Sequence, residues 1–525
     1  MSVAVILLGL CFVIVLARPV WQAYSRLPEL SGPTPSSVVL GYRYDLHSAP
    51  AGSLFSRWRS KYGPVYRVRG PFGTTELVMG DPKGASHVLG TYSFIRNESN
   101  RALLWELFGH SIFTAEGAFH KQQRAVLNSA FTSANVREVS GVILDLANKL
   151  RENWENRLGK AASSSLIIDV SHELQTLAID AISMTTFSYA ISENAPLSSL
   201  LSKIANVPLT KAALVAESFV EAFPAIWKLP IPIKQWPRMM KAELGKIADR
   251  VWKDSEIEGV TGGGMHSKLL EAMNNSKVLS GEPMDRDLAV ANILAVIFAG
   301  YETTASAIGE CLHQLALQST IQNKIRQELF SFADATGRDP TYDDLTSATQ
   351  MPYLDAVARE TMRTYPIVMN VTREASVEES IPLQTPLRST GATHIVVKPG
   401  QLIHIPIRGG INNDPDIWGL DADKFRPERW LESGKAGLPE TVKTVRAPGH
   451  ILTFGDGPKI CVGRYFAMAE FKIVIATLVR YFHFEHAGID YDFYRFGSNA
   501  VKPKVRGKDG LPPSLELRVK AVSDA

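Results

Sequence analysis

Residues 454–463 read FGDGPKICVG, a stretch in which Cys461 stands among three glycines and a proline. A cysteine that only packs in a core does not need such neighbours. Gly455, Gly457 and Gly463 allow backbone conformations that residues with a Cβ atom resist. The loop can therefore turn backbone N–H groups toward one sulfur and stabilise it as a thiolate.

The residues on either side of the loop fit the same interpretation. Phe454 can shield the sulfur from water, and an apolar run predicts a helix over about 462–482 whose N-terminal partial charge favours a thiolate. A dinucleotide-binding loop is excluded, because Ile460 stands where its third glycine is needed. A buried structural cysteine is the other alternative, although the spacing Phe-x-x-Gly-x-x-x-Cys-x-Gly arises rarely by chance.

Composition places the chain among globular proteins. It has 525 residues, of which 45% are hydrophobic and 21% are charged, enough for a large core. A net charge of +3 is too small to indicate nucleic acid as a partner. The three cysteines, Cys11, Cys311 and Cys461, exclude a disulfide framework and a four-cysteine zinc site, and they fit a reducing compartment.

The first residues predict a membrane anchor. No residue from Ser2 to Ala17 is charged, and Arg18 and Arg26 follow, so we expect a transmembrane helix over 1–20. A cleaved signal peptide is the alternative, but no basic residue precedes the apolar run and no convincing cleavage site follows it. Because the positive charge lies on the C-terminal side, the rest of the chain is expected in the cytosol.

Beyond the anchor the sequence predicts one large domain. A Pro-rich hinge is expected over 21–50, and residues 51–525 follow without a second low-complexity linker or an internal repeat. Strand patterns occur at 65–79 and 367–407, and helical patterns dominate from about 117 to 327. The predicted fold class is therefore mainly α with small β-sheets.

The loop FGDGPKICVG resembles the haem-binding loop of the cytochrome P450 family, the haem-thiolate monooxygenases. The resemblance implies that Cys461 is the metal ligand, on the proximal side of haem b, and that Phe454 and Gly463 lie against the cofactor. It also implies a single cytochrome P450 type domain with the haem between a central helix and the cysteine loop. The chain departs from the family at Lys459, where arginine is usual, because lysine can meet a haem propionate only as a point charge.

Two further segments match landmarks of this family in the expected order. Glu360 and Arg363 fit its Glu-x-x-Arg pair, and residues 425–430, FRPERW, resemble its Pro-Glu-Arg-Phe segment. The resemblance implies that Glu360, Arg363 and Arg429 form a buried carboxylate–guanidinium network beneath the haem. The alternative is an ordinary surface pair at i, i+3 spacing.

An apolar run at 288–298 predicts a buried core helix, because the run is too short to span a bilayer. The residues that follow resemble the family's Ala-Gly-x-acid-Thr segment, in which Ala299 and Gly300 are small enough to leave room for oxygen. The resemblance implies that Thr303 steadies the activated oxygen and a water, and that Glu302 connects this site to bulk protons. The alternatives are a threonine bonded to a carbonyl one turn back and an acid held in an ion pair.

Cations are expected for the haem propionates. His120 and Arg124 lie one turn apart on the helix predicted to open at 117, and Arg373 matches another propionate-binding position of the family. With Lys459 they make up the expected propionate site. Each of them alone could be solvated surface charge.

Substrate contacts are expected by region from the resemblance, and the residues there are mainly apolar. They are Trp105, Phe108, Ile112, Phe113, Val296, Ile367, Val368 and Ala500. Such a lining favours a hydrophobic small molecule. Segments near His120 and at 381–386 are similar to fungal members, where oxidation of terpenoids and other secondary metabolites is common.

As a whole, the resemblance implies a single-pass enzyme of the endoplasmic reticulum membrane, with membrane lipid as a partner. It would insert one atom of O2 into its substrate with NADPH-derived electrons. Since the chain has no flavin or nicotinamide motif, a cytochrome P450 reductase, with cytochrome b5 as a further donor, would deliver the electrons. Docking is expected on a basic face near Lys459, Arg464 and Lys472. The rivals are a haem-thiolate isomerase or dehydratase that uses no O2, and a non-catalytic haem sensor.

Overall fold

The computed structural model covers most of the chain. The described residues are 27, 29–161, 164–206, 210–222, 286–431, 437–496, 499–508 and 511–522, with scattered positions between 234 and 249. The membrane anchor expected at 1–20 lies outside them, as does the beginning of the expected hinge.

Helices form the larger part of the described chain. They are α2 (Tyr42–Ser48), α3 (Ser53–Tyr62), α4 (Pro82–Gly90), α5 (Glu98–Phe108), α6 (Gly117–Ala130), α7 (Ser133–Lys160), α8 (Val170–Phe187), α9 (Ala195–Ala205), α10 (Lys211–Ala222), α13 (Arg286–Leu317), α14 (Ser319–Thr336), α15 (Tyr342–Thr346), α16 (Pro352–Thr364), α17 (Pro415–Trp418) and α18 (Arg464–Tyr481). The prediction of a mainly helical chain is confirmed.

The strands form small sheets. A five-stranded sheet has the order β1-β2-β8-β5-β3, with β1 (Val65–Arg69), β2 (Thr75–Met79), β8 (Leu402–Pro406), β5 (Asn370–Ala375) and β3 (Phe94–Ile95). A three-stranded sheet has the order β4-β12-β9, with β4 (Ser165–Asp169), β12 (Glu516–Ala521) and β9 (Phe482–His486). Two hairpins join β6 (Glu379–Pro382) to β7 (His394–Val397) and β10 (Tyr491–Arg495) to β11 (Val501–Val505).

Pairing in the five-stranded sheet joins the two regions where strands are predicted. β1 and β2 form an antiparallel hairpin in which Val65 lies opposite Met79. β8 then pairs in parallel with β2, and β5 runs antiparallel to β8. Strands at 65–79 and within 367–407 are therefore confirmed, and they belong to one sheet.

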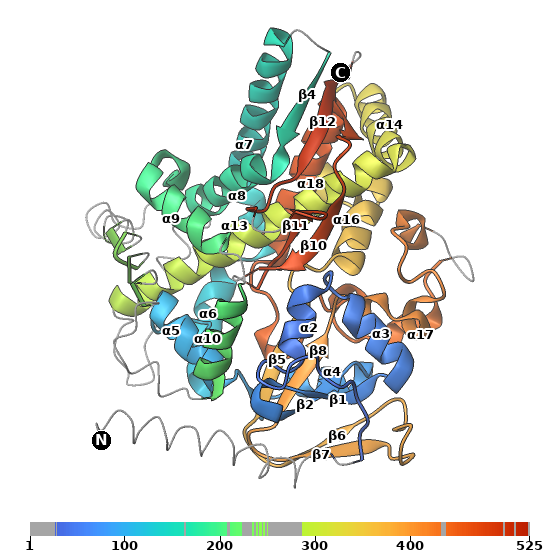
Figure 1. The fold of residues 1–525 in the computed structure, drawn as a ribbon. Coiled ribbons are helices and arrows are strands. Elements are labelled where there is room, and N and C mark those ends of the chain that lie inside the picture. The colour runs from blue at the N-terminus through green and yellow to red at the C-terminus, as the bar shows by residue number, and fades with distance from the viewer. Residues whose placement is uncertain are drawn as a thin grey trace.

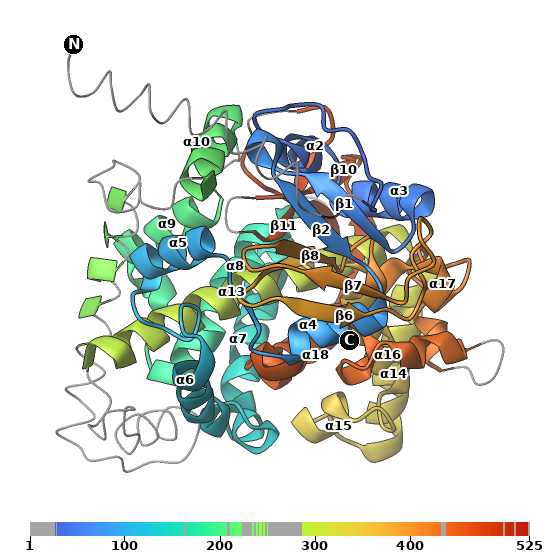
Figure 2. The same cartoon turned by 90° about the horizontal axis from the view of Figure 1, so that it is seen from below.

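The five-stranded sheet lies on one side of the molecule, and many of the helices lie on the other (Figure 1). Figure 1 shows α13 crossing its middle, with the five-stranded sheet and α2 and α3 gathered on one side of it. Figure 2, the view from below, shows the β6–β7 hairpin in front of this sheet and α5, α9 and α10 grouped apart from it. The long central helix α13 thus lies between the sheet and the helices on the other side of the molecule (Figure 1).

α13 is a core helix. Every residue from Leu288 to Ile297 is buried, and the polar member of that run, Asn292, accepts a hydrogen bond from the Ile112 backbone N–H at 2.9 Å. Among the described residues, α13 is the one helix long and apolar enough to cross a membrane, yet 78% of its most apolar stretch is buried in the protein. The prediction of a buried helix here is confirmed.

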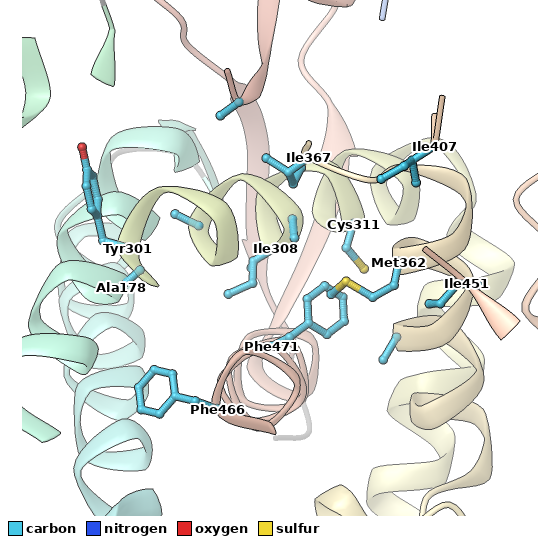
Figure 3. Close-up of a cluster of buried hydrophobic side chains, with 14 of the residues drawn as sticks. Ala178, Tyr301, Ile308, Cys311, Met362, Ile367, Ile407, Ile451, Phe466 and Phe471 are labelled. Atoms are coloured by element: carbon cyan, nitrogen blue, oxygen red, sulfur yellow. The ribbon is translucent and has the colours of Figure 1, made fainter. Parts of the chain in front are cut away.

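α18 follows the cysteine loop and passes under α13. Figure 3 shows Phe466 and Phe471 projecting from α18, with Phe471 beside Met362 of α16 and below Ile308 and Cys311 of α13. The helix predicted over about 462–482 is confirmed, with both ends slightly inside the expected bounds.

The described part of the expected hinge is folded onto the domain. Leu30, Leu40 and Tyr42 are 3%, 6% and 4% exposed, and the Tyr42 hydroxyl lies 3.0 Å from Nε2 of His404 on β8. The described residues before 51 therefore pack with the domain, because these side chains bury apolar surface. The boundary at residue 51 stays a prediction.

Candidate active site

The loop that presents Cys461 depends on two of its glycines. Gly455 and Gly457 have φ values of 74° and 65°, in the left-handed region that favours glycine. A Cβ atom on Gly457 would lie 2.3 Å from the carbonyl oxygen of Leu89, at the end of α4. The Cys461 backbone N–H donates to the Phe454 carbonyl at 2.7 Å, which closes the loop.

The third glycine acts through its N–H group. Gly463 has a φ of −86°, which any residue adopts, so its backbone conformation does not require glycine. Burial raises the pKa of the Cys461 thiol, while a hydrogen bond from the Gly463 N–H and the charges of Arg124 and Arg464 lower it. Cys461 nevertheless keeps accessible surface, so packed neighbours do not enclose it completely.

Two of the expected propionate-binding cations are buried close together. Arg373 on β5 is 6% exposed, and burial and the charge of Arg96 lower its pKa to about 9. Burial also lowers the pKa of Lys459 to about 8, although Lys459 forms an ion pair with Glu116. Glu116 is the one carboxylate among the described residues that acts on Arg373, Lys459 and Arg96, so this cluster carries excess positive charge.

Arg96 is a member of the cluster that sequence reasoning missed. Its backbone N–H donates to Glu116 at 2.9 Å, and its guanidinium lies 5.6 Å from the ring centre of Phe113. Its Nε is buried without a hydrogen-bond partner among the described residues. The available signal was an arginine directly after the short apolar strand β3, which is too common to single out a site.

His120 and Arg124 lie beside this cluster on α6. His120 is 3% exposed, its Nδ1 lies 3.0 Å from the Tyr92 hydroxyl, and burial and the charge of Lys459 lower its pKa to about 4. His120 is therefore neutral at physiological pH. Arg124 donates to the Ile460 carbonyl, next to the cysteine.

On the central helix, Thr303 and Gly300 both have close neighbours within the protein. The Thr303 hydroxyl donates to the Ala299 carbonyl at 2.8 Å, as in the alternative left open, and both residues are only half-buried. A Cβ atom on Gly300 would come 2.8 Å from Cγ1 of Ile182 on α8. The small size of Gly300 therefore lets α13 approach α8. Room for oxygen beside Ala299 and Gly300 stays a prediction.

Glu302 lies in a buried ion pair. Its Oε1 is 2.6 Å from Nζ of Lys502 on β11, and the two side chains are 3% and 1% exposed. Lys502 also donates to Oδ1 of Asn206 at 2.8 Å, while burial lowers the pKa of this lysine and Glu302 raises it. Lys502 gave no signal of its own in the sequence, because its partner lies far away along the chain.

Glu360 is surrounded by donors. Arg363 donates to both of its oxygens at 2.9 and 2.8 Å, Arg429 donates to Oε1 at 2.9 Å, and the Trp430 indole donates to Oε2 at 2.9 Å. All three charged side chains are at most 1% exposed. The network ties α16 to the segment that resembles Pro-Glu-Arg-Phe.

The residues expected near a substrate fall into two groups. Phe108 is fully buried, with its ring centre 5.6 Å from Phe113 and 5.2 Å from Phe298 of α13. Trp105 is half-exposed instead, with its ring against His110.

The second group is gathered by the late hairpin. The Val501 backbone N–H donates to the Ile367 carbonyl at 2.9 Å, which brings the turn containing Ile367 and Val368 next to Ala500. Val296 is 6% exposed and lies on α13, as Phe298 does.

The expected docking face is corrected in part. Lys459 is held by Glu116, and Lys472 is 3% exposed with its Nζ 2.6 Å from Oδ1 of Asp355. Neither lysine can meet a partner protein, because each is inside the fold. Arg464 remains nearer the surface, with its guanidinium over the ring of Tyr465.

This fold and this site define a class of enzymes. This mainly helical chain presents a thiol from a glycine-rich loop beside buried cations, and the helix after the loop packs against a long central helix. Such an arrangement is suited to a haem-thiolate centre. The family model for cytochrome P450 matches residues 31–504. The chain belongs to the cytochrome P450 family, and it is an oxidoreductase of the monooxygenase kind.

Its curated relatives are fungal. Cytochrome P450 monooxygenase claQ of Ampulloclitocybe clavipes is 30% identical over 509 residues, which cover 94% of this chain and 93% of that protein. Cytochrome P450 monooxygenase claW of the same fungus is 30% identical over 523 residues, covering 96% and 94%. Cytochrome P450 monooxygenase 128 of Postia placenta is 29% identical over 527 residues, covering 94% and 93%.

The residues present fit the cofactor of this family. An iron porphyrin needs one axial ligand and partners for two carboxylates. The chain offers Cys461, which keeps accessible surface, and a buried cluster in which Arg96, Arg373 and Lys459 share one carboxylate. Two propionates would supply the anions that this cluster lacks.

Proposed function

We propose that this chain is a membrane-anchored monooxygenase that inserts one atom of O2 into a hydrophobic small molecule. The observation that carries the proposal is the setting of Cys461, with the Gly463 N–H directed at its sulfur and an excess of buried cations nearby. Two electrons from NADPH would come through a separate cytochrome P450 reductase, with cytochrome b5 as a further donor.

The cofactor in this proposal is haem b. Cys461 would bind its iron, and the propionates would be held by Arg96, His120, Arg124, Arg373 and Lys459. When bound, the haem supplies the activation of O2 and the transfer of an oxygen atom to the substrate. The thiolate that such ligation needs is favoured by the Gly463 N–H and by the positive charges of Arg124 and Arg464.

Protons would reach the site along α13. Thr303 can rotate its hydroxyl from the Ala299 carbonyl toward the reacting oxygen, since threonine donates to either. Glu302 would pass protons on, and Lys502 would hold its carboxylate in place. A small pocket reaches Lys502, and its polar lining includes Ser171, Gln175 and Ser306, which can bind water.

The substrate would be a hydrophobic small molecule, such as a terpenoid or another secondary metabolite. Support comes from the aromatic cluster of Phe108, Phe113 and Phe298, in which the half-buried Phe113 and Phe298 offer apolar surface. Ala299 and Thr303 on α13 are half-buried and have small side chains.

The membrane part of the proposal rests on the sequence alone. The uncharged stretch from Ser2 to Ala17, followed by arginine, favours a single-pass anchor in the endoplasmic reticulum with the catalytic domain in the cytosol. Membrane lipid is then the second partner.

The proposal is tested with the purified haem protein, an added reductase and a panel of terpenoid and fatty substrates. We expect some panel members to shift the haem spin state and then to be oxidised, with NADPH consumed and one oxygen atom from O2 in the product. Conversion of substrate without O2 would support the isomerase or dehydratase instead. Haem binding with no O2 consumption on any panel member would contradict the proposal.

A further inference from the structure

Glu470 is a carboxyl group with no part in the scheme above. It lies on α18, the helix that begins just after Cys461, and its side chain is completely buried. Neither carboxyl oxygen has a hydrogen-bond partner of good geometry, and Glu470 forms no ion pair, within the described part of the chain. A buried charge without a partner is strongly unfavourable.

The nearest basic residue on the same helix is engaged elsewhere. Lys472 places its Nζ 2.6 Å from Oδ1 of Asp355 and 3.2 Å from the Thr346 carbonyl. Residues two apart on a helix do not face each other, so Lys472 and Glu470 point to different sides of α18. Lys472 therefore leaves the Glu470 carboxyl without a compensating cation.

The group that acts on the Glu470 carboxyl is the hydroxyl of Thr304. Thr304 is 3% exposed and belongs to α13, next to Thr303. Burial raises the pKa of Glu470 well above its usual range, and hydrogen bonding to Thr304 opposes this only in part. α13 and α18 pack against each other, and Figure 3 shows Phe471, the residue after Glu470, below Ile308 of α13.

We propose that Glu470 is a protonated carboxyl that donates its O–H to the Thr304 hydroxyl and so fixes the cysteine helix against the central helix. A neutral carboxyl has one donor and needs one acceptor, which Thr304 supplies. Glu470 is a positioning residue, because it acts on Cys461 through α18 and on Thr303 through Thr304. What the contact positions rests on the proposed function, whereas the protonation state does not.

The protonation state is tested by infrared spectroscopy of the purified holoprotein at alkaline pH, where ordinary carboxyls are ionised. We expect the wild type to show the C=O stretch of a protonated carboxyl above the amide I band, and Glu470→Gln to lose it. The matched control is Glu440→Gln, since Glu440 is 85% exposed and paired with Lys443. If Glu470→Gln instead removes a carboxylate band, or changes neither band, Glu470 is not a buried acid and the proposal is overturned.

The positioning role is tested on the carbon monoxide complex of the reduced holoprotein. We expect Glu470→Ala and Thr304→Val to lose the Soret band of thiolate ligation about tenfold faster than wild type on mild heating, the size expected when a buried polar group loses its partner. Glu470→Gln should match wild type, because its amide N–H can still donate to Thr304. Equal rates for Glu470→Ala and Glu470→Gln would overturn the positioning role. A wild type without that band would contradict the proposed function instead, and the infrared result would still stand.

Discussion

Lys459 and Glu116 form a pair that sets this site apart at the scale of single residues. Lysine stands here in place of the usual arginine, and its ammonium forms an ion pair with the Glu116 carboxylate. Arg96 and Arg373 then remain as the buried guanidinium groups beside it. Because guanidinium forms two parallel hydrogen bonds with a carboxylate, these arginines are better suited than Lys459 to hold a propionate.

The ion pair of Glu302 and Lys502 leads to a prediction about stability. Lys502→Met leaves a buried carboxylate without its cation, so we expect it to lower the free energy of unfolding by about 3–5 kcal/mol. Urea unfolding of the holoprotein measures this. The double variant Glu302→Gln/Lys502→Met should cost less than Lys502→Met, since no uncompensated charge remains.

The control for this experiment is an exposed pair. Lys443 and Glu440 are 68% and 85% exposed, and Lys443→Met should change the free energy of unfolding by less than about 1 kcal/mol. If Lys502→Met costs as little as Lys443→Met, the buried pair does not have the role given to it here.

Single residues divide into those that the sequence can predict and those that it cannot. The loop around Cys461 was predictable, because it is one continuous pattern in which Gly455 and Gly457 adopt left-handed backbone conformations. Lys502 and Arg96 were not, because each acquires its partner from a distant segment and neither lies in a motif. The partner of Glu302 was likewise a matter of tertiary packing, which left the ion pair only as an alternative.

At the scale of elements, the contact between α8 and α13 passes through Gly300. Because Gly300 has no side chain, the two helices come together at Ile182. A Cβ atom added to Gly309 on the same helix would instead make ordinary contacts, the nearest with Leu515 at 3.7 Å. The composition of the segment, small residues before an acid and a threonine, does not tell these roles apart. The contact of Gly300 with α8 is visible only once the position of α8 is known.

This contact predicts the effect of a larger residue. Gly300→Ala should lower the melting temperature, because the added methyl forces α8 and α13 apart at a cost of about 1–3 kcal/mol. Ile182→Ala in the same chain should restore part of the loss by making room. Thermal unfolding followed by circular dichroism measures both variants.

Gly309→Ala is the matched control for that helix. It should be neutral or stabilising by up to about 1 kcal/mol, because alanine favours the helical state. Equal effects of the two alanines, or no rescue by Ile182→Ala, would show that Gly300 does not serve the helix contact.

Elements were predicted well where one pattern spans them. The apolar run of α13 and the run after Cys461 each indicated a helix, and both exist. The described part of the expected hinge is packed for a physical reason. Its Pro, Ser and Gly content indicates a linker, but the scattered apolar residues Leu30, Leu40 and Tyr42 supply enough buried surface to fix it to the sheet.

At the scale of the whole molecule, stability depends on histidines kept neutral inside the fold. His313 of α13 is 7% exposed, its ring lies 5.4 Å from that of Phe493 and 6.0 Å from that of Tyr491, and its Nδ1 has no hydrogen-bond partner among the described residues. Burial and the nearby charge of His486 lower its pKa from 6.5 to about 4. The native state thus binds fewer protons than the unfolded chain between these values.

The sign of the resulting pH dependence follows from linkage. Stability contributed by neutral His313 is present above about pH 6.5 and is lost as the pH falls toward 4, and it amounts to about 2 kcal/mol between pH 7 and pH 5. His313→Phe should reduce the pH dependence of the urea midpoint by that amount. An unchanged pH dependence in this variant would mean that His313 is not neutral in the native state.

The central claim concerns the bond between Cys461 and a haem iron, and its most direct measurement is the absorption spectrum of the reduced protein with carbon monoxide. The wild type should show the Soret band of thiolate ligation, and Cys461→Ser should lose it. Cys311→Ser, a change at the buried thiol of α13, should keep it. A wild type that never shows the band, or a Cys461→Ser variant that retains it, would contradict this account.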